Sequence, residues 1–170
     1  MRKSGFWVAY SLLLVAQILL SNYFRFTPYI TLSILPVMVL CISTRIKTSA
    51  CMLIAFLTGL TVDWLAEGVL GLNALALVPV ALLRNPIIHM MFGEGMFTRE
   101  EDFTVQGNGF AKVLLTIFMG QALFLAIYIW ADGAGLRPLW FCLSRFSASL
   151  AAGLLVSLLT LNVLAADPHR

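Results

Sequence analysis

Two carboxylates stand close together in an otherwise apolar part of the chain. Asp63 ends an apolar run and Glu67 follows four residues later, a spacing that places both side chains on one face if the helix continues. A carboxylate at the centre of a membrane-spanning helix costs roughly 2.5–3.5 kcal/mol on insertion scales, so its presence needs a reason. Two interpretations stay open. Either both acids cap a helix at the outer membrane interface, or Asp63 accepts hydrogen bonds from a neighbouring helix or a partner protein.

Other residue types that perform chemistry are scattered. His89 has no second histidine or cysteine at metal-ligand spacing, so neither a zinc site nor a catalytic triad can be assembled around it. Cys41, Cys51 and Cys142 form no CxxC pair and lie in or beside apolar runs, where a free thiol usually acts as a small hydrophobic side chain. The GxSG, GxGD and P-loop motifs are all missing. We therefore expect no enzyme activity, no metal and no cofactor.

One segment has a superficial likeness to an enzyme motif. The run Asp132-Gly133-Ala134-Gly135-Leu136-Arg137 resembles the opening of the motif of membrane CDP-alcohol phosphotransferases. Leu136 replaces an alanine of that motif, and no acid follows until Asp167. The carboxylates that would hold a divalent ion are therefore missing.

The composition indicates that these residues sit in a membrane protein. Of the 170 residues, 61% are hydrophobic and only 11% are charged, and the mean hydropathy is +0.94. A soluble globular domain carries about 25% charged residues, so this chain has too little polar surface for water. The chain has room for about six membrane spans of about 20 residues each with short loops, and we expect a single transmembrane domain over 1–170.

The apolar runs predict an all-α integral membrane protein with six transmembrane helices. The expected helices cover 5–22, 29–44, 49–65, 69–83, 110–130 and 139–164, with a cytoplasmic loop over 85–109. The third and fourth runs must be separate helices, because one helix over both would be about 52 Å long. Glu67-Gly68 supplies the break between them. Pro36 and Pro79 lie inside two of these runs, where each proline is expected to kink the helix.

Basic residues indicate the orientation of the chain. With the N-terminus in the cytoplasm, eight of the eleven Lys and Arg residues fall on the cytoplasmic side, and only Arg25, Arg137 and Arg145 fall outside. The positive-inside rule therefore favours cytoplasmic N- and C-termini, with Gly133 external. Arg145 lies seven residues into the last run. We expect it to snorkel to the interface, with a buried partnership to an acid as the alternative.

The predicted loop over 85–109 carries a short acidic patch. Glu100, Glu101 and Asp102 are adjacent, which is more acid than a tight connection needs. The simplest interpretation is a solvated face, since charge runs usually are. The alternative is a docking surface for a soluble cytoplasmic partner, whose association would be steered by charge.

The two central runs resemble a known family. The run Gly59-Leu60-Thr61-Val62-Asp63, then Gly71-Leu72-Asn73-Ala74-Leu75-Ala76, then Leu82-Leu83-Arg84 is similar to the central signature of the rod shape-determining protein MreD family. Pro28-Tyr29-Ile30 and Leu35-Pro36 resemble the second-helix segment of Bacteroidetes-type members. The likeness covers most of the chain in length, helix number and loop placement. Its most specific part is the GLxxD…GxxA pattern, and Asn73 stands where His or Asn is common.

The resemblance implies a function. Members of this family are non-enzymatic components of the bacterial cell-elongation machinery in the cytoplasmic (inner) membrane, and they bind the membrane-anchored protein MreC. Through MreC they connect to MreB filaments, to the transglycosylase RodA and to a penicillin-binding transpeptidase. We expect Gly59, Asp63, Glu67, Gly71, Asn73 and Arg84 to form the partner-binding or structural motif.

The same family is similar in fold to the six-helix substrate-binding component of energy-coupling-factor vitamin transporters. This similarity gives an alternative function, the binding of a vitamin-type small molecule for transport. Such a component needs a sizeable pocket with a few convergent polar groups. The sequence offers few side chains to line one, namely Asp63, Glu67, Asn73, Gln121 and Arg145.

Overall fold

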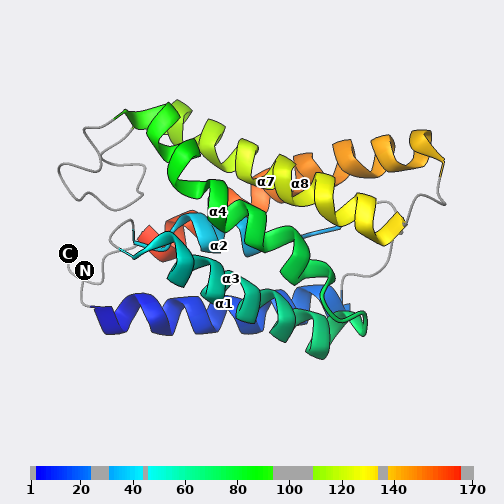
Figure 1. Ribbon diagram of the computed structural model, residues 1–170, viewed down its shortest axis with the longest axis horizontal. Coiled ribbons are helices and arrows are strands. Elements are labelled where there is room, and N and C mark those ends of the chain that lie inside the picture. Colours follow the sequence, from blue (N-terminus) through cyan, green and yellow to red (C-terminus); the bar gives the residue numbers. More distant parts are fainter. Residues whose placement is uncertain (1–2, 24–30, 44–45, 94–108, 134–137, 166–170) are drawn as a thin grey trace.

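The protein is a bundle of helices (Figure 1). A computed structural model describes residues 3–23, 31–43, 46–93, 109–133 and 138–165, and these contain no strand. The helices in chain order are α1 (Lys3–Tyr23), α2 (Leu35–Leu40), α3 (Thr48–Val62), the π-helical turn η1 (Asp63–Glu67), α4 (Leu72–Phe92), α7 (Phe110–Gly133) and α8 (Leu139–Ala165).

Five helical stretches in the described residues are long and apolar enough to cross a membrane. They are α1, α3 continued into η1, α4, α7 and α8. Large apolar side chains such as Leu12, Leu57 and Leu155 remain mostly exposed on their outer faces. Apolar patches of this extent are rare on soluble monomers, whereas lipid covers them without cost. The all-helical prediction is confirmed, and these surfaces are consistent with a multi-pass membrane protein.

The second predicted helix differs from the structure. Of the range 29–44, the described part is helical only over Leu35–Leu40, while residues 31–34 are irregular. Pro36 explains where α2 begins. Its missing N–H is harmless in the first helical turn, where no intrahelical partner exists, but inside a longer helix it would leave the carbonyl of Leu32 without a donor.

Gln17 of α1 supplies the hydrogen bonds that this irregular segment lacks. Its amide nitrogen donates to the carbonyl of Leu32 at 3.3 Å, and its amide oxygen accepts from the backbone N–H of Ile34 at 2.8 Å. Gln17 is itself buried, at 2% exposure. Unpaired backbone groups in an apolar environment cost several kcal/mol each, so irregular backbone at this depth requires such a partner.

Two later helices hold two further backbone groups of the segment. The Gln121 amide of α7 donates to the carbonyl of Ser33 at 3.2 Å, and the Ser149 hydroxyl of α8 accepts from the N–H of Thr31 at 2.8 Å. Gly153, one turn after Ser149, leaves room for Gln121, because a Cβ there would lie 2.4 Å from the Gln121 amide nitrogen. The irregular segment is therefore fixed from α1, α7 and α8 at once.

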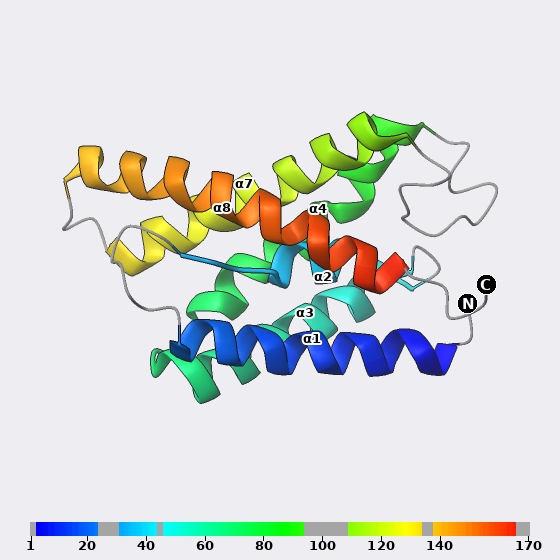
Figure 2. The same ribbon diagram turned by 180° about the vertical axis from the view of Figure 1, so that it is seen from behind.

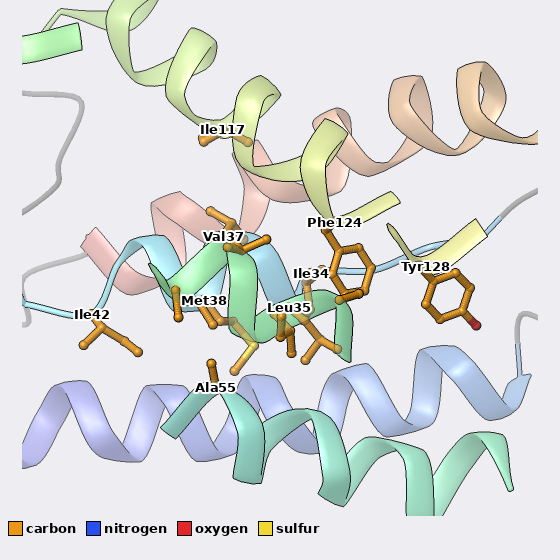
Figure 3. Close-up of a cluster of buried hydrophobic side chains, with 14 of the residues drawn as sticks. Ile34, Leu35, Val37, Met38, Ile42, Ala55, Ile117, Phe124 and Tyr128 are labelled. Atoms are coloured by element: carbon orange, nitrogen blue, oxygen red, sulfur yellow. The ribbon is translucent and has the colours of Figure 1, made fainter. Parts of the chain in front are cut away.

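The short helix α2 forms the centre of the core. All six of its residues are buried, and it contacts α1, α3, α4, α7 and α8. Figure 3 shows Val37 on the side of Ile117 in α7 and Met38 on the side of Ala55 in α3. The surrounding helices therefore pack their apolar faces on α2 while their opposite faces remain outside.

The predicted loop over 85–109 is wrong at its start. Helix α4 continues to Phe92, so 85–92 is helical. The polar residues that suggested an end of the span lie within the packing, since Arg84 is buried and the Asn85 amide donates to Thr48 Oγ1 at 3.1 Å. Pro79 and Pro86 are both accommodated inside α4. The acidic patch Glu100, Glu101 and Asp102 lies outside the described residues.

The two ends of the bundle have different characters. The start of α1 and the end of α8 lie at the same end, as both Figure 1 and Figure 2 show. At the opposite end four aromatic side chains on four elements are exposed, namely Tyr23, Trp64, Trp130 and Trp140. Tyr and Trp are enriched at membrane interfaces. We therefore take this end of the bundle as one of the two interfaces.

A labelling experiment tests the orientation. Gly133, the residue expected outside, is buried at the end of α7, so exposed Pro138 serves better, with exposed Lys47 for the cytoplasmic side. In a background without the three native cysteines, Pro138→Cys should react with an impermeant maleimide on intact cells, because the positive-inside rule places it outside. Lys47→Cys should react only after permeabilisation. The reverse pattern would overturn the orientation.

Candidate functional site

The motif residues of the two central runs meet at the connection between α3 and α4. Helix α3 continues into the π-helical turn η1, which closes with a hydrogen bond from Gly68 N to Asp63 O at 2.9 Å. Gly68 and Gly71 adopt φ values of 73° and 96°, which residues other than glycine rarely adopt. The predicted break at Glu67-Gly68 is confirmed, and Gly71 lets α4 begin directly after the turn.

Asp63 is buried and binds the start of α4. Its Oδ1 accepts from the backbone N–H of Asn73 and from the Asn73 side-chain amide, both at 2.9 Å. Its Oδ2 accepts from the N–H groups of Gly71 at 3.0 Å and Ala74 at 3.3 Å. The first N–H groups of a helix lack intrahelical partners, and the helix dipole favours negative charge there. The carboxylate therefore caps α4 from another helix.

This geometry decides between the two interpretations of Asp63. The side chain is 0% exposed and accepts hydrogen bonds from a neighbouring helix, which is the second interpretation. It also acts as a cap, but the helix that it caps is α4 and not its own. Glu67 ends η1, and its side chain lies outside the described part of the structure.

Gly59 brings the backbones of α3 and α4 into contact. A Cβ at this position would lie 2.6 Å from both the Cα and the N of Ala74, and 2.9 Å from the carbonyl carbon of Asn73. These are backbone atoms, which cannot move aside as the end of a side chain can. Gly59 therefore sets the close approach that lets the Asp63 carboxylate reach the first turn of α4.

Asn73 has a role that the sequence did not reveal. Its side-chain amide donates to Asp63 Oδ1, and the residue is only 2% exposed. A histidine at this position could make the same donation, because a neutral imidazole also carries one N–H.

Arg84 lies away from the other motif residues. It stands eleven residues after Asn73 in the same helix, which is about 17 Å along the axis. It is 1% exposed, and its Nη1 donates to the Cys51 thiol of α3 at 3.2 Å. The motif therefore divides into one hydrogen-bonded cluster at the α3–α4 connection and a separate buried cation.

Arg145 has partners inside the protein, which corrects the expectation of snorkelling. It forms an ion pair with Asp132 of α7, and its Nε and Nη2 donate to Thr31 Oγ1 at 3.1 and 2.9 Å. Its guanidinium carbon lies 5.9 Å from the centre of the Tyr128 ring, a distance at which a cation and a ring attract. Arg145 therefore ties α7, α8 and the irregular segment together.

A groove of about 500 Å³ lies between α7 and α8. Its lining is almost wholly apolar and includes Trp130, Cys142 and Phe146. None of the five polar residues proposed to line a ligand pocket is among its lining residues. Among the residues that the structure describes, no group of three His, Cys, Asp or Glu side chains is placed to hold a metal ion.

No protein-family model, curated protein or solved structure matches this chain. Gly59, Asp63, Gly71 and Asn73 contribute to one connection in the structure.

Removing the Asp63 carboxylate should loosen this connection. Asp63→Ala leaves three buried donors and one half-buried donor without an acceptor, and we expect it to lower the free energy of unfolding by about 2–4 kcal/mol. Asp63→Asn keeps one oxygen but turns an NH2 group toward two N–H donors, so it should cost about half as much. Chemical denaturation in detergent micelles measures both. The control is Thr61→Ala, since that hydroxyl bonds only to its own helix; equal losses in all three variants would contradict this role of Asp63.

Gly59→Ala tests the close approach separately. The added methyl group should force α4 outward and cost about 1–3 kcal/mol, as overpacking does in other cores. Gly5→Ala is the matched control, because a Cβ at Gly5 meets nothing within 4 Å. Comparison of the two melting temperatures in one detergent gives the difference. A Gly59→Ala protein as stable as Gly5→Ala would mean that the two helices are not held this tightly.

Proposed function

We propose that the chain is a non-enzymatic membrane scaffold of the bacterial cell-elongation complex. In this proposal it binds MreC in the cytoplasmic membrane and supports cell shape and peptidoglycan synthesis. Its links to MreB, to RodA and to the penicillin-binding transpeptidase are indirect. The observation that carries the proposal is that Gly59, Asp63 and Gly71, which belong to the most specific part of the MreD-like signature, contribute together with Asn73 to one close-packed connection.

The use of the buried polar side chains also supports a scaffold. Asp63 and Asn73 bind each other, Gln121 binds the backbone of Ser33, and Arg145 binds Asp132 and Thr31. A binding protein for a small molecule keeps a few polar groups directed at its pocket. Here the corresponding groups hold helices together, which favours a rigid scaffold over the vitamin-binding component of a transporter.

Asp63 acts in this proposal as a positioning residue. It is buried, so it does not itself contact MreC in the assembled bundle. Its hydrogen bonds fix the path of the chain from α3 through 68–71 into α4, where the exposed side chains of Val69 and Leu70 stand at the surface. Loss of the carboxylate would therefore alter the shape of this surface without removing any residue from it.

Purification from native membranes tests the proposed function. The tagged chain should copurify with MreC and other cell-elongation proteins, while Asp63→Ala should be present at normal abundance but retain less MreC. Thr61→Ala is again the control. Copurification of an ATPase module and a bound vitamin, without MreC, would establish the transporter function instead.

The acidic patch gives a second measurement on the same complex. If Glu100, Glu101 and Asp102 attract a cytoplasmic partner, their joint replacement by alanine should slow association and weaken copurification of that partner. The effect should shrink as salt concentration rises, because salt screens exposed charges. A triple variant that supports rod growth and copurifies with its partners normally would show that the patch only solubilises the loop.

A further inference from the structure

The guanidinium of Arg84 is buried without a counter-charge in the described bundle. Its Nη1 donates to the Cys51 thiol, which is a weak acceptor, while Nε and Nη2 have no hydrogen-bond partner. A buried charge that lacks a partner is strongly destabilising, so proteins rarely keep one unless something occupies the site.

The acidic residues of the described part of the chain belong to the far end of α3 or are already paired. Asp63 and Glu67 belong to η1 at the opposite end of α3, and Asp132 is paired with Arg145. Asp63 binds Asn73, and Asn73 lies about 17 Å from Arg84 along the axis of α4. The negative charge that Arg84 lacks must therefore come from outside this part of the chain.

The surroundings of Arg84 are also electropositive. Its contact Cys51 lies in the first turn of α3, and that helix begins after Lys47 without any side-chain cap. The N-terminus of a helix carries a partial positive charge and presents free N–H groups, which makes it a site for anions. A guanidinium beside it is unfavourable unless an anion lies between them. No backbone carbonyl in the described bundle accepts a hydrogen bond from Nε or Nη2 of Arg84.

Further donors stand at the edge of this place. The Asn85 amide donates to Thr48 Oγ1 at 3.1 Å, and its own oxygen is buried without a partner. If the Asn85 amide is flipped, its oxygen accepts from the Thr48 hydroxyl, so the bond between the two residues is kept. The NH2 group then takes the place of the unpaired oxygen as a donor. Lys47 is exposed just before α3. Positively charged groups are therefore present both inside the bundle, at the Arg84 guanidinium, and at its surface, at the Lys47 ammonium group.

Position and chemistry indicate the ligand. From Thr48 to Glu67 the third span measures about 30 Å, so its first turn lies where the hydrocarbon meets the headgroups. Guanidinium, amide and helix N–H groups together are the donors that bind phosphate. We propose that Arg84, Asn85 and the first turn of α3 bind the phosphate of an anionic phospholipid in the leaflet at this end, which the basic residues predict to be cytoplasmic. This proposal is independent of the proposed function.

The test compares lipids on the purified full chain. The protein in a neutral detergent receives phosphatidylglycerol, phosphatidylcholine or inorganic phosphate, and its melting temperature and bound lipid are measured, the latter by native mass spectrometry. The variants are Arg84→Met and the control Lys112→Met, which removes the same charge from an exposed position in the first turn of α7. Methionine keeps the apolar volume of the arginine stem.

We expect phosphatidylglycerol to raise the melting temperature of the parent and of Lys112→Met more than phosphatidylcholine does. Arg84→Met should bind phosphatidylglycerol at least about tenfold more weakly, as the loss of a charge-assisted contact implies. Without lipid, Arg84→Met should be at least as stable as the parent, because it removes an unpaired buried charge. An equal response to phosphatidylglycerol in both variants would overturn the proposal.

Two other outcomes would also overturn it. Stabilisation by inorganic phosphate but not by phosphatidylglycerol would assign the site to a soluble anion. The second outcome concerns stability without lipid. If Arg84→Met and the triple alanine variant of Glu100, Glu101 and Asp102 were both less stable than the parent by the same amount, the chain's own acids would be the counter-charge.

Discussion

A peptide group that lies within the membrane and outside a helix must find a partner inside this protein, because neither lipid nor the apolar interior offers one. The segment 31–34 and the α3–α4 connection are two places in the described bundle where the backbone departs from α-helix. In both places side chains from elsewhere in the chain pair with backbone groups. Gln17 acts as a substitute for a neighbouring backbone, donating to one peptide group and accepting from another. Pro36 makes this substitution necessary, since it denies Leu32 its helical donor.

The same rule explains why an acid is tolerated at position 63. The carboxylate pairs with three buried donors and one half-buried donor, and the benefit of pairing them offsets the cost of burying the charge. Gly59 makes the contact possible by letting the two backbones touch. Arg84 is the contrasting case. It is equally buried, yet two of its nitrogens remain unpaired, so the reasoning that makes Asp63 structural points to a ligand for Arg84.

The amino-acid sequence predicted most of the helices because their apolar runs are long and uniform. It also located the turn at Gly68, and it predicted that Gly59 and Asp63 belong to a structural or partner-binding motif. It predicted α2 wrongly, since the run 29–44 is apolar throughout and hydropathy cannot distinguish a lipid-facing helix from a segment buried on all sides. It also favoured snorkelling for Arg145, whose partner Asp132 lies on another helix and can be paired with it only once the packing is known. Gln17, an amide within an apolar run, was the available signal that a neighbouring segment is irregular.

The burial of α2 constrains the order in which the protein can be completed. The irregular segment before α2 emerges from the ribosome soon after α1, and Gln17 is then already present. Gln121 and Ser149, which satisfy Ser33 and Thr31, are synthesised some ninety residues or more later. Until α7 and α8 arrive, this segment has unpaired peptide groups and no apolar neighbours on those sides. The centre of the mature bundle can therefore be completed only after the C-terminal half has been made.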